Sequence, residues 1–135
     1  MAMFLFTDAI INDKPIKVFN NGNLERDFTY IDDITEGVVR ILETPFTDET
    51  SKKHLFKIYN IGNSKSVKLM DFITAIEESL DTVAKKEMLP MQPGDVEKTW
   101  ANVDDLINDY DYKPNTPINE GVKSFIYWYK NYFKI

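Results

Sequence analysis

Residues 26–33, Arg-Asp-Phe-Thr-Tyr-Ile-Asp-Asp, constrain what this chain can fold into more than any other segment. Alternate side chains of an extended segment point to opposite faces, so Arg26 shares a face with two aromatic residues. The carboxylates of Asp32 and Asp33 then precede a run with helical spacing and predict a capped helix start. A cation on a strand that leads into a helix N-terminus is suited to holding an anionic ligand.

Amphipathic periodicity predicts helices along the rest of the chain, separated by short strand and turn signals. The helices are expected at residues 2–13, from a cap at Asp32 or Asp33 to Pro45, from a cap at Ser66 to Leu80, from a cap at Asn102 to Tyr110, and from Thr116 and Pro117 to Phe133. The expected apolar stripe of the second helix consists of Ile34, Val38, Ile41 and Leu42.

Strand signals alternate with these helices. We expect strands at 16–19 and at 55–62, the second mostly buried, and an irregular turn at 88–95. Residues 20–23 predict a turn, and their Asn-Gly pair is a strong hairpin signal. The alternation indicates an α/β fold of mixed short strands and amphipathic helices. With 135 residues and no repeat or linker, the chain predicts one domain over residues 1–135.

Composition excludes several classes of function. The net charge of −6 argues against a nucleic-acid partner, because phosphate-backbone binders carry an excess of Lys and Arg. The absence of cysteine excludes disulfides and zinc-thiolate sites. The apolar start, residues 1–6, is too short to cross a bilayer, so no membrane partner and a cytoplasmic location are expected. The only histidine, His54, sits in a polar run and is interpreted as a surface-loop residue.

Residues for redox or acid–base chemistry are missing from the sequence. The five glycines are too widely spaced for a dinucleotide or P-loop phosphate site. None of the seven tyrosines is followed by lysine four residues later. The acidic pairs at 32–33 and 104–105 fall at predicted helix starts, where capping accounts for them. We therefore assign no catalytic residue, no metal site and no cofactor site.

Two features remain as candidates for binding, and the residues alone leave both open. Arg26 either contacts a phosphate, a charge-assisted contact of about 1.5–3 kcal/mol, or forms a surface ion pair with Asp27 or Glu25. Residues 92–95, Gln-Pro-Gly-Asp, form either a plain β-turn or a rigid turn that presents an amide and a carboxylate to ribose hydroxyls.

Taken together, several segments resemble a known family. They are Ile16–Phe19, Asn21-Gly22, Arg26–Asp33, Tyr59–Asn63, Met88–Val96, Tyr112–Pro114, Gly121-Val122 and Trp128-Tyr129, in this order. This pattern resembles the C-terminal, substrate-binding part of NAD-dependent nucleotide-sugar epimerases and dehydratases, which are extended short-chain dehydrogenases. The segment at 88–95 is most similar to UDP-glucuronate 4-epimerases. The resemblance implies a longer family enzyme that continues upstream of Met1.

The resemblance also implies a role for each matching residue. Arg26 matches an arginine that contacts the diphosphate of a UDP-sugar. Phe19 and Val18 match a strand whose backbone meets the uracil ring, and Asp95 matches an acid that binds the ribose hydroxyls. Gln92 stands where UDP-galactose epimerases carry a second phosphate-binding arginine, a departure that suits the uronate branch.

The implied function is that of a UDP-sugar-binding fragment of a UDP-glucuronate 4-epimerase. The family places its glycine-rich Rossmann half and its catalytic Tyr-x-x-x-Lys elsewhere, so NAD is expected in the intact enzyme and not in this chain. Alone, the chain is expected to bind UDP-sugar weakly and to be inactive. Two alternatives remain open. One is a self-associating module or complementing fragment, in which uncovered apolar faces bind a partner and the sugar site is vestigial. The other is a UDP-glucuronate decarboxylase or a nucleotide-sugar dehydratase.

Overall fold

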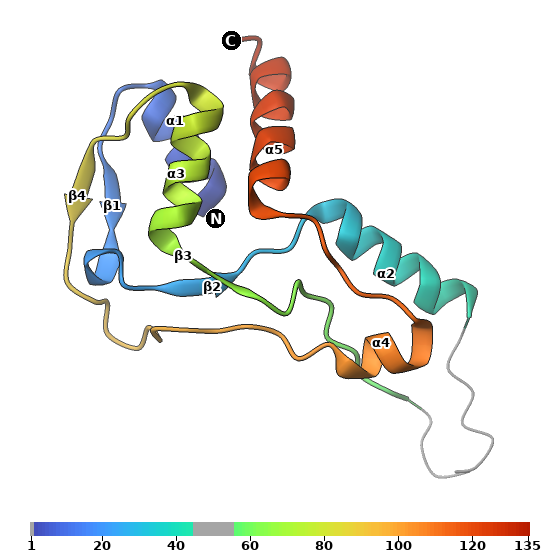
Figure 1. Cartoon of the computed structure of the whole chain (residues 1–135). Helices are drawn as coiled ribbons and strands as arrows, with labels where there is room; N and C mark the ends of the chain where they lie inside the picture. Colours follow the sequence, from blue (N-terminus) through green and yellow to red (C-terminus); the bar gives the residue numbers. More distant parts are fainter. Residues whose placement is uncertain (1, 45–55) are drawn as a thin grey trace. The chain divides into compact units, whose positions relative to one another are not determined.

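The computed structural model describes residues 2–44 and 56–135 and shows the expected mixture of helices and short strands (Figure 1). Its elements, in chain order, are α1 Ala2–Ile11, β1 Ile16–Val18, η1 Phe19–Gly22, β2 Glu25–Asp27, α2 Ile31–Glu43, β3 Ser66–Lys68, α3 Leu69–Leu80, β4 Lys86–Met88, α4 Asp104–Tyr110 and α5 Ile118–Phe133. The predicted mixed α/β class is confirmed. No helix in the described ranges has both the length and the apolar character needed to span a membrane.

The described residues form two compact units, although the chain crosses between them several times. Unit 1 comprises residues 1–26, 66–99 and 117–135, and unit 2 comprises residues 27–65 and 100–116. The prediction of one partial nucleotide-sugar-binding domain over 1–135 concerned function, and it stays a prediction.

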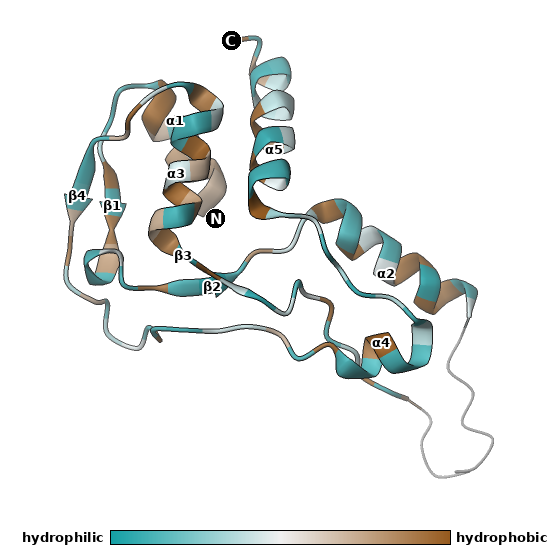
Figure 2. Ribbon diagram, in the orientation of Figure 1, coloured by the Kyte–Doolittle hydropathy of each residue, from teal (hydrophilic) through white to brown (hydrophobic). Residues whose placement is uncertain are grey.

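Unit 1 is built on two parallel strands covered by helices. Strands β1 and β4 pair in parallel, with Ile16 opposite Lys86 and Val18 opposite Met88. Apolar residues that recur every three or four positions on α3 and α5 provide much of the core, and Figure 2 shows them alternating with hydrophilic ones. The buried side chains include Ile16, Val18, Phe72, Ile73, Ile76, Val122 and Ile126.

The turn after β1 forms as predicted, but it does not make a hairpin. Asn20 and Asn21 adopt left-handed backbone angles, with φ of 49° and 48°, inside the 3-10 turn η1. The hairpin expectation was wrong because β1 pairs with β4 and β2 pairs with β3. A β-carbon at Gly22, whose φ is +83°, would lie 2.7 Å from the Met70 sulfur, so the turn requires glycine both for its backbone angle and for space.

The caps predicted at Asn102 and Thr116 are each displaced by one residue, to Val103 and Pro117. The other two predicted helix caps were wrong because their side chains bind elsewhere. Helix α2 begins after Tyr30, and the carboxylate of Asp33 accepts a hydrogen bond from the Thr116 amide at 3.0 Å within unit 2. Ser66 lies in β3, and its hydroxyl donates to Glu25 at 2.6 Å within unit 1. The predictions for Pro45 and His54 fall outside the described residues.

In unit 2, the predicted strand over 55–62 does not form in its described part. Residues 56–62 belong to no β-ladder, and the side chains of Phe56 and Ile58 are 75% and 77% exposed, so the expectation of burial was also wrong. A strand needs a paired neighbour for its backbone groups, and the described residues supply none at this segment. The predicted stripe of α2 is likewise only partly covered, because Val38 and Leu42 are exposed.

Candidate functional site

Four of the predicted binding residues lie at or after the carboxyl ends of the two parallel strands of unit 1: Val18 and Phe19 at the end of β1, and Gln92 and Asp95 on the turn that follows β4. The amide of Leu89, just after β4, donates to the carbonyl of Val18 at 2.9 Å, and the amide of Asn21 donates to the carbonyl of Leu89 at 3.0 Å. Phe19 and the turn at 92–95 therefore both follow the same end of the strand pair. In α/β proteins, ligands commonly bind at the carboxyl ends of parallel strands.

Residues 92–95 form a tight turn, as the sequence predicted. The amide of Asp95 donates to the carbonyl of Gln92 at 3.2 Å, and Gly94 has a φ of +81°. Proline at the second position and a positive φ at the third are typical of a type II turn. The turn leaves Gln92 exposed and Asp95 half-buried.

Backbone pairing places this turn beside β2. The amide of Glu25 donates to the carbonyl of Glu97 at 2.7 Å, and the amide of Thr99 donates to the carbonyl of Glu25 at 3.2 Å. Residues 97–99 thus run alongside β2, which on its other side pairs with β3. Because of this register, the side chain of Arg26 reaches Asp95.

Arg26 is fixed by contacts from two directions. Its Nη1 donates to the carbonyls of Glu25 at 2.8 Å and Glu97 at 3.2 Å, and its Nη2 lies 2.5 Å from Oδ1 of Asp95. The two side chains of this ion pair are each 29% exposed. The sequence left open an ion pair of Arg26 with Asp27 or Glu25, and the structure gives Asp95 as the partner instead, 69 positions away.

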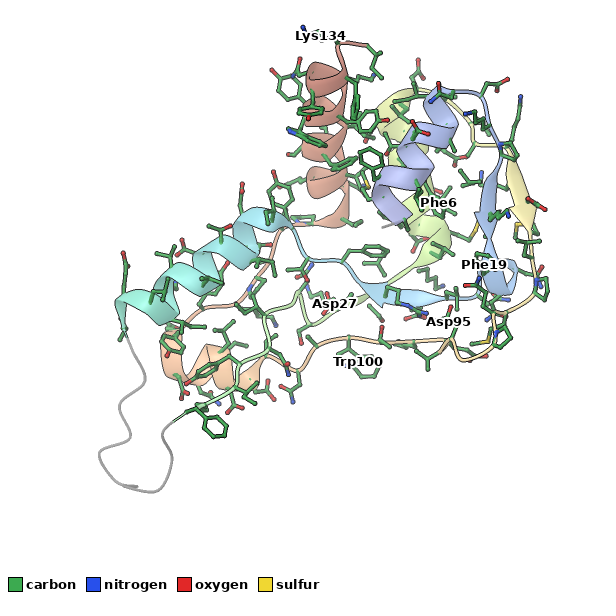
Figure 3. All side chains as sticks on the ribbon, turned by 180° about the vertical axis from the view of Figure 1, so that it is seen from behind. Phe6, Phe19, Asp27, Asp95, Trp100 and Lys134 are labelled. Atoms are coloured by element: carbon green, nitrogen blue, oxygen red, sulfur yellow. The ribbon has the colours of Figure 1, made fainter. Side chains whose placement is uncertain are left out.

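The other two predicted residues differ in what they can offer a ligand. Val18 is fully buried, backbone included, and its carbonyl accepts the hydrogen bond from the Leu89 amide, so the predicted contact of Val18 with a ligand is not open in this structure. Phe19 is half-buried in η1. Figure 3 labels Phe19 and Asp95, both of which belong to unit 1.

A second charged group lies beside Arg26, and sequence reasoning missed it. Oε2 of Glu25 lies 2.8 Å from Nζ of Lys98 and accepts the Ser66 hydroxyl, and these contacts lower the pKa of Glu25. The group borders a cavity of about 340 Å³ lined by Gly22, Asn23, Leu24, Glu25, Lys68, Met70, Glu97 and Lys98. Positive and negative side chains are balanced there, and no sequence motif marked them.

Unit 2 contains a carboxylate that binds the backbone of two other segments. Asp27, labelled in Figure 3, accepts hydrogen bonds from the amides of Asn63 at 3.1 Å, Ser64 at 3.0 Å and Ala101 at 3.1 Å. Three amide donors satisfy this carboxylate without any ligand. Asp27 therefore acts as a structural residue of unit 2.

The two parallel strands of unit 1 lack the strand-to-helix turn of a dinucleotide site. Strand β1 is followed by η1 and strand β4 by the Pro-Gly turn, so neither leads directly into a helix whose N-terminus would hold a pyrophosphate. The described residues also contain no group of three or more His, Asp or Glu side chains arranged to hold a metal ion.

Comparison with known proteins gives matches over nearly the whole chain. The chain is 47% identical to Protein CapI of Staphylococcus aureus, covering 99% of this chain and 43% of that protein. It is 40% identical to a probable UDP-glucuronate 4-epimerase of Rhizobium meliloti, covering 98% of this chain and 42% of that protein. The solved UDP-glucuronic acid 4-epimerase of Bacillus cereus, in complex with UDP-glucuronic acid and NAD, is 30% identical with a TM-score of 0.83, covering 98% of this chain and 40% of that one.

The chain thus spans about two-fifths of the length of these relatives. The model of the NAD dependent epimerase/dehydratase family matches residues 1–62 of the chain. That match does not by itself place the chain on the C-terminal side of its relatives, which stays a prediction. The chain is therefore similar to the NAD dependent epimerase/dehydratase family model over residues 1–62 and, over nearly its whole length, to part of Protein CapI and of a probable UDP-glucuronate 4-epimerase.

Proposed function

We propose that this chain is the UDP-sugar-binding part of a UDP-glucuronate 4-epimerase and corresponds to the C-terminal side of the whole enzyme. The observation that carries the proposal is the pairing of Arg26, on β2, with Asp95, on the turn that follows β4. These two residues are the phosphate-binding and hydroxyl-binding groups expected from the sequence. Supporting evidence comes from the Bacillus cereus relative, which was solved with UDP-glucuronic acid.

In this proposal Arg26 binds the diphosphate. Its Nη1 is held by two backbone carbonyls, so the guanidinium keeps one orientation, and an incoming anion meets Nη2, which also contacts Asp95. Asp95 binds the ribose hydroxyls from its turn. The backbone of the half-buried Phe19 contacts the uracil ring, and the exposed amide of Gln92 borders the sugar side.

The same proposal makes the isolated chain inactive as an epimerase. Hydride chemistry needs a cofactor. NAD is bound in the Bacillus cereus relative, and in this proposal its site belongs to the part of the enzyme outside this chain. We expect no conversion of UDP-glucuronate when the purified 135-residue chain is incubated with NAD. Steady formation of UDP-galacturonate, measured by chromatography, would contradict this expectation.

The binding role is tested by titrating UDP into the chain and measuring heat or amide chemical shifts. Arg26→Ala should weaken UDP binding by about tenfold or more, because a charge-assisted contact of about 1.5–3 kcal/mol is lost. Lys85→Ala is the matched control, since Lys85 also forms an ion pair at 2.5 Å in unit 1, with Asp13. An equal effect of both variants, or no effect of Arg26→Ala, would refute the assignment.

The weak affinity expected for the isolated chain has a physical reason. Ligand sites usually enclose most of the ligand surface, and a site with fewer walls buries less of it and orders fewer groups in advance. We therefore expect a dissociation constant for UDP on the order of high micromolar to millimolar, because such a site buries only part of the ligand. A chain that does not respond to millimolar UDP would favour the alternative below.

A second candidate function, self-association, is favoured by exposed apolar side chains in each unit. In unit 2, Ile31, Leu42 and Phe56 are exposed, and in unit 1 the exposed rings of Trp128 and Tyr132 stack with centroids 5.3 Å apart. Exposed apolar patches of this kind often mark interaction surfaces. Sedimentation equilibrium across a hundredfold range of concentration decides: a monomer throughout would exclude this function, and oligomers without UDP binding would support it.

The assignment of the epimerase reaction is also more specific than the family description, which includes both epimerases and dehydratases. We choose it over a UDP-glucuronate decarboxylase or a dehydratase because the Rhizobium meliloti relative is named a probable UDP-glucuronate 4-epimerase. The full-length protein from the same genome would test the choice: UDP-galacturonate as product supports it, and UDP-xylose or a 4-keto-6-deoxy sugar overturns it.

A further inference from the structure

The candidate site already contains an anion. Arg26, expected to bind phosphate, lies 2.5 Å from a carboxylate oxygen of Asp95 in the ligand-free protein. The two carbonyls on Nη1 hold the guanidinium in place, so a phosphate that approaches Nη2 meets the Asp95 carboxylate at the same nitrogen. Two anions at one cation repel each other unless one of them finds other donors.

The Asp95 carboxylate is arranged to accept such donors. Among the described residues, its two hydrogen bonds, from Arg26 and from the Val96 amide at 2.9 Å, both go to Oδ1. Oδ2 is thereby left for a ligand. The turn that carries Asp95 is fixed by the Asp95–Gln92 hydrogen bond, so the carboxylate stays close to Arg26 while it exchanges partners.

The surrounding charges do not favour a bare anion. Glu25 and Glu97 line the neighbouring cavity together with two cations, Lys68 and Lys98, and Lys98 lies 2.8 Å from Glu25. A phosphate without other groups would have to displace Asp95 in a neighbourhood with no excess of positive charge.

We propose that Asp95 determines ligand selectivity. In the free protein its carboxylate occupies Arg26 as an internal anion. It gives up this contact only to a ligand whose hydroxyl groups donate hydrogen bonds to the carboxylate. The ligand class is a nucleoside diphosphate, whose diphosphate takes Nη2 and whose ribose diol occupies Oδ2. Inorganic pyrophosphate gives Asp95 no hydroxyl and is disfavoured. This inference rests on the proposed function, because it assigns a second role to a residue of the same site.

The test compares inorganic pyrophosphate and UDP as probes of the wild type and of Asp95→Asn. The amide keeps the shape of the side chain but removes its charge, so pyrophosphate should bind about fivefold to tenfold more tightly to the variant, a change of the order expected for one close like charge. UDP should bind about fivefold less tightly, because a charged acceptor of the diol is lost. Glu87→Gln on β4 is the control, since it makes the same change in net charge at an exposed position.

Each outcome separates this inference from the proposed function. Equal weakening of both probes by Asp95→Asn, or no effect on either, would overturn the selectivity role. A wild type that does not bind UDP would refute the proposed function. Tighter binding of pyrophosphate to Asp95→Asn than to the wild type would still show that Asp95 acts as the internal anion. Arginine-selective NMR adds an independent measurement: the Nη resonances of Arg26 should shift in Asp95→Asn and stay unchanged in Glu87→Gln.

Discussion

Replacing Gly62 with alanine is the most sharply defined perturbation that the structure offers. Gly62 is buried in unit 2, and a β-carbon built there would lie 2.6 Å from the β-carbon of Ala101 and 3.0 Å from Oδ2 of Asp27. Its backbone angles are open to any residue, so the effect comes from lack of space and not from conformation. Ala101 has no side-chain torsion that would move its methyl group, and the backbone must therefore shift.

The expected magnitude follows from these two contacts. Overpacking in a well-packed region costs about 1–3 kcal/mol. The same shift disturbs the hydrogen bonds that Asp27 accepts from the amides of Ala101 and Ser64, and a bond to a charged group contributes about 1.5–3 kcal/mol. Partial loss of these bonds brings the expected decrease in the free energy of unfolding to about 2–4 kcal/mol.

Two measurements are suited to this prediction. Urea unfolding followed by circular dichroism reports the global change, and hydrogen exchange reports the local one, through the amides of Asn63, Ser64 and Ala101 that donate to Asp27. The double variant Gly62→Ala with Ala101→Gly removes the shorter contact and should recover about 1–2 kcal/mol of the loss, a coupling typical of residues in contact.

The reasoning would be refuted by either of two results. A loss below about 0.5 kcal/mol for Gly62→Ala, the size of an ordinary surface effect, would show that unit 2 accommodates the methyl group. If the double variant lost as much free energy of unfolding as the two single variants lose together, the 2.6 Å contact would not be the cause.

Three further predictions concern other contacts. Tyr129→Phe removes a hydroxyl that donates to a carboxylate of α1 at 3.1 Å and should lower the free energy of unfolding by about 0.5–1.5 kcal/mol, whereas Tyr132→Phe, at an exposed position, should leave thermal unfolding unchanged. Asp109 has a pKa below its ordinary value because Lys57 donates a hydrogen bond to it. Its contribution to the free energy of unfolding is therefore fully present above the unfolded-state pKa near 3.8 and is lost as the pH falls through the lower folded-state pKa. Asp109→Asn should flatten the acid side of a profile of stability against pH. Gly94→Ala meets no atom within 4 Å but keeps a φ of +81°, so it should cost about 1–2 kcal/mol of strain and weaken UDP binding through the turn, as calorimetry would show.

The helices of unit 1 were predictable because their signals are local. The spacing of Phe72 and Ile76 on α3, and of Val122 and Ile126 on α5, determines which face of each helix is buried, and all four side chains lie in the core. Such a pattern needs only the chain within a few turns, since side chains three and four positions apart share a helix face. The turn at 92–95 was predictable for a similar reason, because proline and glycine restrict the backbone directly.

Features that depend on a distant partner were predicted less well. The acidic side chain of Asp33 and the hydroxyl of Ser66 suit helix caps, yet they bind an amide at position 116 and a carboxylate at position 25. The apolar alternation at 55–62 suits a strand, but alternation does not provide the neighbouring strand that backbone hydrogen bonds require. In each case the local preference was real, and tertiary contacts decided the outcome.

The ion pair of Arg26 shows most clearly what a single sequence leaves undetermined. Neighbouring residues of a strand project to opposite faces, so the adjacent acids Glu25 and Asp27 are poor partners for this guanidinium despite their closeness in sequence. The partner Asp95 is brought into reach because β2 pairs with residues 97–99, and this pairing joins segments about 70 positions apart. The residues of the site were therefore recognisable one by one, but the Arg26–Asp95 contact, on which the selectivity proposal depends, follows only from the register of that pairing.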